Sequence, residues 1–185
     1  GQISPCIAGL RFLRGIHIAD NHISGHIPPE IGGLTRLRYL NLSRNSITGV
    51  IPDTICSGPH LAVIDLSINS ITGVIPDSIS SCSRLEVIRL RNNSIEGVIP
   101  PALAHCSSLQ EIVLSNNKLN GTIPPGIGLL HDLTFLFLPS NKLEGIIPST
   151  LGRIPSLSIL VLRNNSLSGE MPPLLANCSS LYYLD

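Results

Sequence analysis

Residues 37–52 read LRYLNLSRNSITGVIP, and variants of this stretch recur along the chain at one fixed interval. The asparagine at position 45 returns every 24 residues, with no insertion or deletion between copies. A strict period of this size predicts a solenoid, in which each unit covers its apolar face with the next unit. The seven asparagines that mark the period are Asn21, Asn45, Asn69, Asn93, Asn117, Asn141 and Asn165.

The first half of each unit predicts a short strand followed by a turn. Leu40 and Leu42 alternate with Tyr39 and Asn41, which places the leucines on the inner face and the other two residues outside. Asn45 follows where the chain leaves the strand, and its carboxamide can both donate to and accept from buried backbone groups. Stacked from unit to unit, these side chains are expected to form a hydrogen-bonded ladder.

The second half of each unit predicts a tight bend and a short return segment. Gly49 allows the bend at little steric cost, and Pro52 discourages a long helix directly after it. The return segments are rich in Gly and Pro, so each has room for only one or two helical turns.

The full pattern, L-x-x-L-x-L-x-x-N-x-L-x-G-x-I-P, resembles the plant-type leucine-rich repeat found in the extracellular parts of receptor-like kinases and receptor-like proteins, and it covers essentially the whole chain. The resemblance implies an α/β-type solenoid of about eight 24-residue repeats. It also implies a right-handed superhelix with one parallel concave β-sheet and short 3₁₀ or helical turns on the convex side. We expect residues 1–185 to form a single domain, an internal piece truncated at both ends and without caps.

Composition and motifs argue against several classes of function. Charged residues make up 13% of the chain and the formal net charge is zero, so we expect neither a nucleic-acid partner nor membrane contact by this segment. No phosphate loop, metal-ligand spacing or nucleophile elbow is present. His17, His22 and His26 cluster in the sequence, but we interpret them as solvated surface residues. The sequence therefore predicts no enzyme, no metal and no cofactor.

The outward strand positions are the candidate ligand-binding surface, because the repeat does not dictate their identity. Apolar residues gather there in the C-terminal half, and such clusters often mark binding surfaces. The alternative is that some of these side chains tilt into the sheet surface or are covered by further repeats. The candidate residues are Arg89, Arg91, Val113, Phe135, Phe137, Ile159, Val161, Arg163, Tyr182 and Tyr183.

Arg89 and Arg91 are expected to point from one strand to the concave face. They resemble the Arg-x-Arg pair that peptide-hormone receptors of this family use to hold a ligand's C-terminal carboxylate. A surface ion-pair ladder with Asp65 and Glu111 on the neighbouring strands is at least as good an interpretation.

The cysteines are interpreted mainly as core residues. Cys82, Cys106 and Cys178 fall in a column that holds Leu or Ile in other repeats, which favours buried free thiols over disulfides. A bridge between Cys82 and Cys106 is the less favoured alternative. Cys56 falls in a column of small residues, and Cys6 lies near the N-terminal end.

Five Asn-x-Ser/Thr sequences indicate a secreted or cell-surface location, with a cytosolic protein carrying unused sequences as the alternative. A glycan on the outward-pointing first site would obstruct the first third of the sheet. The five sites are Asn41, Asn92, Asn120, Asn164 and Asn177.

The sequence therefore favours an extracellular ligand-recognition domain of a plant receptor-like kinase, in immune or peptide-hormone signalling. Its expected partners are a peptide or protein ligand and a shape-complementary co-receptor kinase, at the outer side of the plasma membrane or in the apoplast. The alternative is a secreted, kinase-free defence protein similar to the polygalacturonase inhibitors, for which a charged concave face is expected.

Overall fold

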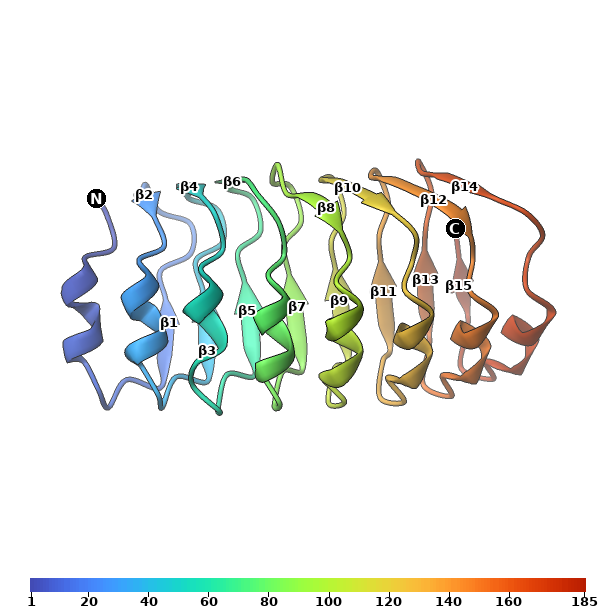
Figure 1. The fold of residues 1–185 in the computed structure, drawn as a ribbon, viewed down its shortest axis with the longest axis horizontal. Helices are drawn as coiled ribbons and strands as arrows, with labels where there is room; N and C mark the ends of the chain where they lie inside the picture. The colour runs from blue at the N-terminus through green and yellow to red at the C-terminus, as the bar shows by residue number, and fades with distance from the viewer.

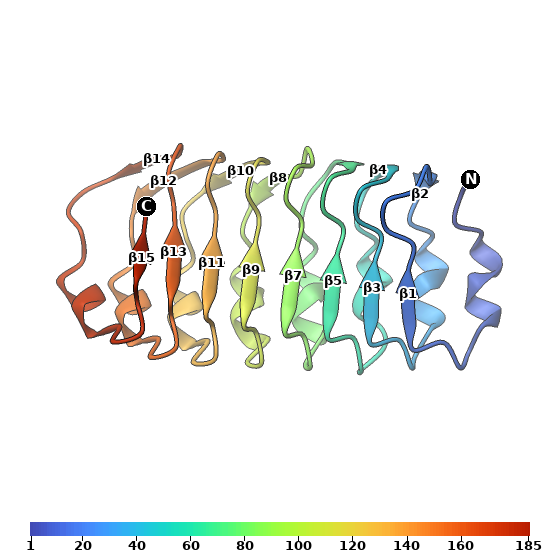
Figure 2. The same cartoon turned by 180° about the vertical axis from the view of Figure 1, so that it is seen from behind.

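The chain winds into a solenoid whose strands line one side and whose helical turns line the other (Figures 1 and 2). The computed structural model describes residues 1–185. Eight strands form one parallel sheet in the order of the sequence, as the repeat pattern predicts. They are β1 (Gly15–His17), β3 (Tyr39–Asn41), β5 (Val63–Asp65), β7 (Val87–Arg89), β9 (Glu111–Val113), β11 (Phe135–Phe137), β13 (Ile159–Val161) and β15 (Tyr183–Leu184).

The sheet is in register, so equivalent residues of successive repeats stack. Leu40 of β3 pairs with Ile64 of β5, and Ile64 pairs with Ile88 of β7. Each of these middle residues points inward and is at most 1% exposed. They belong to a continuous core of 43 buried residues that runs the length of the solenoid. Burial of these Leu and Ile columns is the main source of stability.

Short extended segments near each Gly-x-Ile-Pro stretch form two further parallel sheets along one edge (Figure 1). The three-stranded sheet contains β2 (Ser24–His26), β4 (Ser46–Gly49) and β6 (Ser70–Ile71). The four-stranded sheet contains β8 (Glu96–Val98), β10 (Lys118–Gly121), β12 (Lys142–Ile146) and β14 (Ser166–Ser168).

The convex side carries eight 3₁₀ helices of four or five residues. From η2 onward each begins directly after the proline of an Ile-Pro or Met-Pro pair, where the fixed φ of proline suits the start of a helical turn. The helices are η1 (Pro5–Gly9), η2 (Pro29–Gly33), η3 (Asp53–Cys56), η4 (Asp77–Ser81), η5 (Pro101–His105), η6 (Pro125–Leu129), η7 (Ser149–Arg153) and η8 (Pro173–Asn177).

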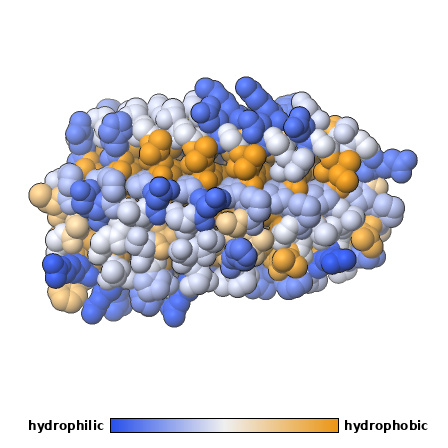
Figure 3. Space-filling model, in the orientation of Figure 1, coloured by the Kyte–Doolittle hydropathy of each residue, from blue (hydrophilic) through white to orange (hydrophobic).

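An apolar band crosses the convex face along the solenoid (Figure 3). Exposed residues that follow the repeat glycines, Val50 and Val74 among them, contribute to the apolar surface. Each lies against the glycine of the next repeat: a Cβ at Gly73 would meet Val50 Cγ1 at 2.8 Å. Gly73 also has a φ of +74°, which side chains rarely adopt. Glycine is therefore required at this turn both for conformation and for close packing.

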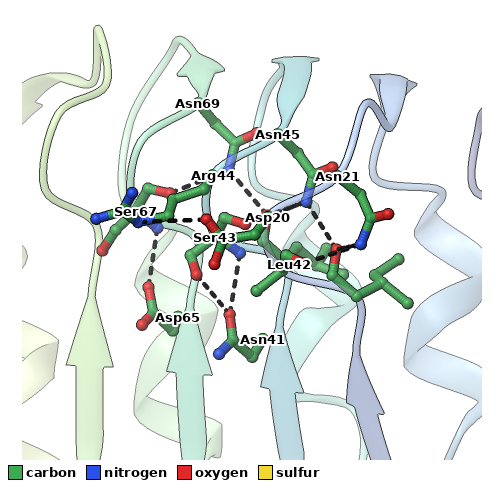
Figure 4. A network of polar contacts seen from close by, with 12 residues as sticks. Asp20, Asn21, Asn41, Leu42, Ser43, Arg44, Asn45, Asp65, Ser67 and Asn69 are labelled. Carbon is green, nitrogen blue, oxygen red and sulfur yellow. Dashed lines mark hydrogen bonds and ion pairs between the residues drawn. The ribbon is translucent and has the colours of Figure 1, made fainter.

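The repeat asparagines form the predicted ladder (Figure 4). Asn45 Oδ1 accepts from the backbone N–H of Ile23 at 2.9 Å, and its Nδ2 donates to the carbonyls of Leu42 and Ile18 at 3.0 and 2.9 Å. Asn69 repeats this arrangement one unit further on. One carboxamide thus satisfies backbone groups of two successive repeats, which links each turn to the next.

The cysteine prediction was wrong for Cys82. Cys82 forms a disulfide with Cys56, with the two Cα atoms 5.0 Å apart. Cys106 and Cys178 are buried free thiols, as predicted. The interpretation failed because only equivalent positions, 24 residues apart, were compared. The bonded cysteines are 26 residues apart, since the bridge runs obliquely from η3 to the residue that directly follows η4.

No helix in the structure is long and apolar enough to cross a bilayer.

Candidate functional site

The strands of the main sheet lie side by side along the concave face (Figure 2), and their register sets which outward side chains are neighbours. Along one row Glu111 of β9 pairs with Phe135 of β11, which pairs with Ile159 of β13. Along the next row Val113 pairs with Phe137. Because each strand contributes two outward positions, aromatic and aliphatic side chains from three strands lie side by side.

Two hollows open on this part of the sheet. The first has a volume of about 480 Å³. Its walls are partly charged and partly apolar, and both predicted arginines belong to it. The lining residues are Asp65, Arg89, Arg91, Glu111, Val113, Ser115, Phe135 and Phe137.

Arg89 is held by carboxylates in the first hollow. Its Nε and Nη2 donate to Glu111 Oε1 and Oε2, both at 2.6 Å, and its Nη1 lies 3.9 Å from Asp65 Oδ2. The hydrogen bonds that Arg89 donates to Glu111 raise the pKa of Arg89, burial opposes this, and the charges of Glu111 and Asp65 add to the increase. Such a bidentate pair fixes the guanidinium in place. For Arg89, the structure therefore supports the ion-pair ladder with Asp65 and Glu111 rather than a free guanidinium for a ligand's carboxylate.

Arg91 differs from Arg89 because it is exposed and has no ion pair. The four charged side chains of the first hollow sum to zero: Asp65 and Glu111 balance Arg89 and Arg91. Since Arg89 is already paired on both sides, Arg91 is the cation with free donors for a ligand.

The second hollow has a volume of about 460 Å³ and lies toward the C-terminal end. It shares Ser115 and Phe137 with the first, so the two are contiguous. Arg163 Nη1 is 3.3 Å from Asp185 Oδ2 at its rim. Its lining residues are Ser115, Asn116, Phe137, Pro139, Ser140, Ile159, Val161, Arg163, Tyr182, Tyr183 and Asp185.

All ten candidate residues lie in one or other hollow. Phe135, Phe137 and Ile159 are half-buried and the two tyrosines are exposed. Val161 departs from the expectation of exposure, because it is only 4% exposed between its neighbours.

Sequence reasoning did not single out the polar residues Ser115, Asn116 and Asp185 as members of the site. Ser115 was identifiable, because it falls in an outward column. The place of Asp185 depends on the ion pair with Arg163, which the sequence pattern does not encode.

Four of the five possible glycosylation sites are exposed, and Asn41 is half-buried. Asn41 Oδ1 accepts from the N–H and the hydroxyl of Ser43 at 3.0 and 2.7 Å, which leaves Nδ2, the atom that carries a glycan, unbonded. Asn92 and Asn164 share one repeat offset and have φ values of 54° and 55° at the turn after their strands.

Comparison with known protein families identifies the repeat. Leucine-rich-repeat models match residues 59–119, and also residues 12–34, 36–57, 132–154 and 156–178. The chain belongs to the leucine-rich-repeat family. The sequence has no match among curated proteins.

Solved structures of plant receptors are similar to this leucine-rich-repeat chain over its whole length. The plant peptide hormone receptor RGFR1, in complex with RGF2, is 33% identical with a TM-score of 0.99, and the match covers 30% of that receptor chain. The Arabidopsis receptor kinase HAESA, in complex with the peptide hormone IDA and the co-receptor SERK1, is 34% identical with a TM-score of 0.97 over 31% of its chain.

A third match is the ectodomain of the Arabidopsis thaliana receptor kinase GASSHO1/SCHENGEN3 in complex with CASPARIAN STRIP INTEGRITY FACTOR 2. It is 35% identical with a TM-score of 0.98, and 22% of that chain is covered. The chain thus spans less than a third of the length of each of these three structures.

Proposed function

We propose that residues 1–185 are part of the extracellular ligand-recognition domain of a plant receptor kinase, and that the two contiguous hollows bind a peptide. The observation that supports this proposal is the surface of apolar and charged side chains that runs from β5 to β15 on the concave face. The solenoid that carries this surface is similar in structure to the peptide hormone receptor RGFR1 and to HAESA, a receptor kinase in complex with a peptide hormone, which favours a peptide over other ligands.

The dimensions suit an extended peptide. From β5 to β15 the hollows span five strand spacings, or roughly 24 Å at about 4.8 Å each. An extended chain covers about 3.3 Å per residue, so about seven residues fit along this length. Apolar ligand side chains would lie against Phe135, Phe137 and Ile159, while Arg91 would receive a carboxylate.

The Cys56–Cys82 disulfide supports the extracellular location, since such bonds form and persist in oxidising compartments. By analogy with the complex that contains SERK1, a co-receptor kinase is a second partner of the receptor. The alternative of a kinase-free inhibitor of a pathogen enzyme, for which a charged concave face is expected, is less favoured because apolar and aromatic side chains line much of the second hollow.

The test is a peptide-binding measurement on the chain and on two matched double variants. The probe is a library of synthetic peptides of about seven to fifteen residues, each made with a free C-terminus and with a C-terminal amide. Phe135→Ala with Phe137→Ala removes the aromatic side chains shared by the hollows. His17→Ala with Tyr39→Ala is the control, since it removes two outward rings from the same sheet outside them.

We expect the Phe variant to weaken every peptide that the unmodified chain binds by on the order of 2 kcal/mol, roughly 30-fold, because buried interface aromatics carry much of the binding energy. The control variant is expected to bind as the unmodified chain does. Binding that survives in the Phe variant, or that disappears equally in the control, would place the peptide elsewhere. A library without any binder would contradict the proposed function.

A further inference from the structure

A basic hollow lies in the first three repeats of the solenoid, where the chain enters the strands of the main sheet. It has a volume of about 290 Å³ and is lined only by Arg14, Arg36, Arg38 and His60. Arg14 and Arg38 directly precede β1 and β3, so they lie where the strands begin, whereas the asparagine ladder lies beyond the ends of the strands. Three of the ten arginines of a chain with zero net charge therefore converge on one small space.

None of the three arginines is neutralised. All are exposed, and none forms an ion pair with a carboxylate. In the column of Arg14 and Arg38 the next residues are Ala62 and then Glu86, so the nearest acid of that column is two repeats beyond Arg38. Like charges gathered in this way repel one another unless an anion joins them.

One of the arginines, Arg36, is also positioned before any ligand arrives. Arg36 Cζ lies 5.0 Å from the centroid of the Phe12 ring, so its guanidinium is stacked on an aromatic face. The backbone N–H of Arg38 donates to the backbone carbonyl of Arg14 at 2.8 Å, which fixes the spacing of the two residues but leaves their side chains free. Preorganised guanidinium groups lose less conformational freedom when they bind an anion.

His60 completes the hollow with a ring whose nitrogens are unbonded. Its Nδ1 is buried without a hydrogen-bond partner, whereas Nε2 is not enclosed. The ring is an additional donor beside the arginines. No possible glycosylation site lies at this edge of the first repeats, because Asn41 is at the far end of β3.

We propose that this hollow, formed by Arg14, Arg36, Arg38 and His60, binds a tetrahedral oxyanion, the sulfate or phosphate ester group of an extracellular ligand. Guanidinium groups match the oxygens of such dianions with paired charge-assisted hydrogen bonds. Three of them around one space are more than a single carboxylate requires. The site shares no lining residue with the peptide hollows, and only the extracellular location of its ligand rests on the proposed function.

The probes are inorganic sulfate and inorganic phosphate, titrated into the chain while the side-chain N–H signals of arginine are followed by NMR. Sodium chloride at the same ionic strength is the first control, and sodium acetate tests a carboxylate. We expect the signals of the three arginines to shift and saturate with sulfate or phosphate at low-millimolar concentration, about the affinity of a small exposed charge site. Preference for one anion identifies the ester as sulfate or phosphate.

Two variants decide whether the hollow is responsible. Arg14→Gln with Arg38→Gln is expected to weaken the binding by about tenfold or more, while Arg36→Gln tests the stacked arginine separately. Arg153→Gln, an exposed and unpaired arginine at the end of η7, is the matched control and should leave the binding unchanged. Far-ultraviolet circular dichroism establishes that each variant is folded.

The proposal is overturned if the shifts grow without saturation, if chloride or acetate produces them equally, or if the Arg14/Arg38 variant binds as tightly as the Arg153 control. The Phe135/Phe137 variant separates this proposal from the proposed function. It should keep sulfate binding while losing peptide binding.

Discussion

Removal of one asparagine from the middle of the ladder should destabilise the solenoid far more than removal of the first one. Asn93 Oδ1 accepts from the N–H of Ile71 at 2.9 Å, and its Nδ2 donates to the carbonyls of Leu66 and Leu90, both at 3.0 Å. In Asn93→Ala all three bonds are lost and the N–H of Ile71 is left without a partner, whereas the carbonyls of Leu66 and Leu90 each keep a bond from another asparagine of the ladder. At about 1 kcal/mol for each lost bond, and more for a group left unsatisfied, the free energy of unfolding should fall by about 3–5 kcal/mol.

Asn21 provides the matched control because its contacts stay within its own repeat. Its Nδ2 donates to the carbonyls of Ile18 and Ala19 at 3.3 and 2.8 Å, and the residue is exposed. Asn21→Ala should therefore cost about 1 kcal/mol or less. Asn93→Asp keeps the acceptor for Ile71 but sets a carboxylate oxygen against the carbonyls of Leu66 and Leu90, so its cost should be at least that of Asn93→Ala.

Urea denaturation followed by circular dichroism measures these differences as changes in the transition midpoint. If Asn21→Ala and Asn93→Ala shift the midpoint equally, the carboxamides do not link successive repeats and their stabilising role is local. A second check is hydrogen exchange, in which the N–H of Ile71 should lose its protection in Asn93→Ala while its chain neighbours in unaffected repeats keep theirs.

Three further outcomes follow from single features of the fold. Replacing Cys56 and Cys82 by Ser should lower the free energy of unfolding by about 3 kcal/mol, given the loop that the bridge closes, and reductant should then leave the melting temperature unchanged; a variant as stable as the parent contradicts this. Ile68 has a φ of 56°, so Ile68→Gly should be more stable than Ile68→Ala by about 1 kcal/mol in thermal melts, the reverse of the usual order in regular structure. Burial raises the pKa of the Cys106 thiol to about 11, so at pH 8 an alkylating agent should modify exposed Cys6 and spare Cys106 in the folded chain. The Cys106 thiol ionises at lower pH in the unfolded chain than in the folded one, so its contribution to the free energy of unfolding is complete below about pH 9 and is lost as the pH rises toward 11. Stability that increases over that range, or equal labelling of Cys6 and Cys106, would contradict this prediction.

The architecture of this protein follows from the repeat period of its sequence. Strands at Leu40 and Ile64, the helical turn after Pro52 and the ladder through Asn45 were all predicted, and the structure confirms them. The reason is that the period sets the direction of each side chain and brings equivalent positions of successive repeats together. Patterns that recur in every unit are determined locally and by neighbouring copies of the same residues.

Tertiary structure decided the contacts between positions that are not equivalent. The Cys56–Cys82 bridge joins residues two places out of phase, and no comparison along a single column could detect it. The column pattern placed Arg89 beside Asp65 and Glu111, but only the side-chain geometry shows that Glu111 binds it bidentately and leaves Arg91 free.

The concave face and the basic hollow also depend on contacts that the repeat pattern does not determine. The outward columns predicted an apolar cluster, yet Val161 in these columns is only 4% exposed, which the alternation of side chains along a strand does not predict. The basic hollow was not evident from the sequence, because its residues come from two columns and three repeats and converge only when the repeats stack. The sequence determines what each repeat presents, whereas the offset between stacked repeats and the side-chain rotamers determine which of those groups meet.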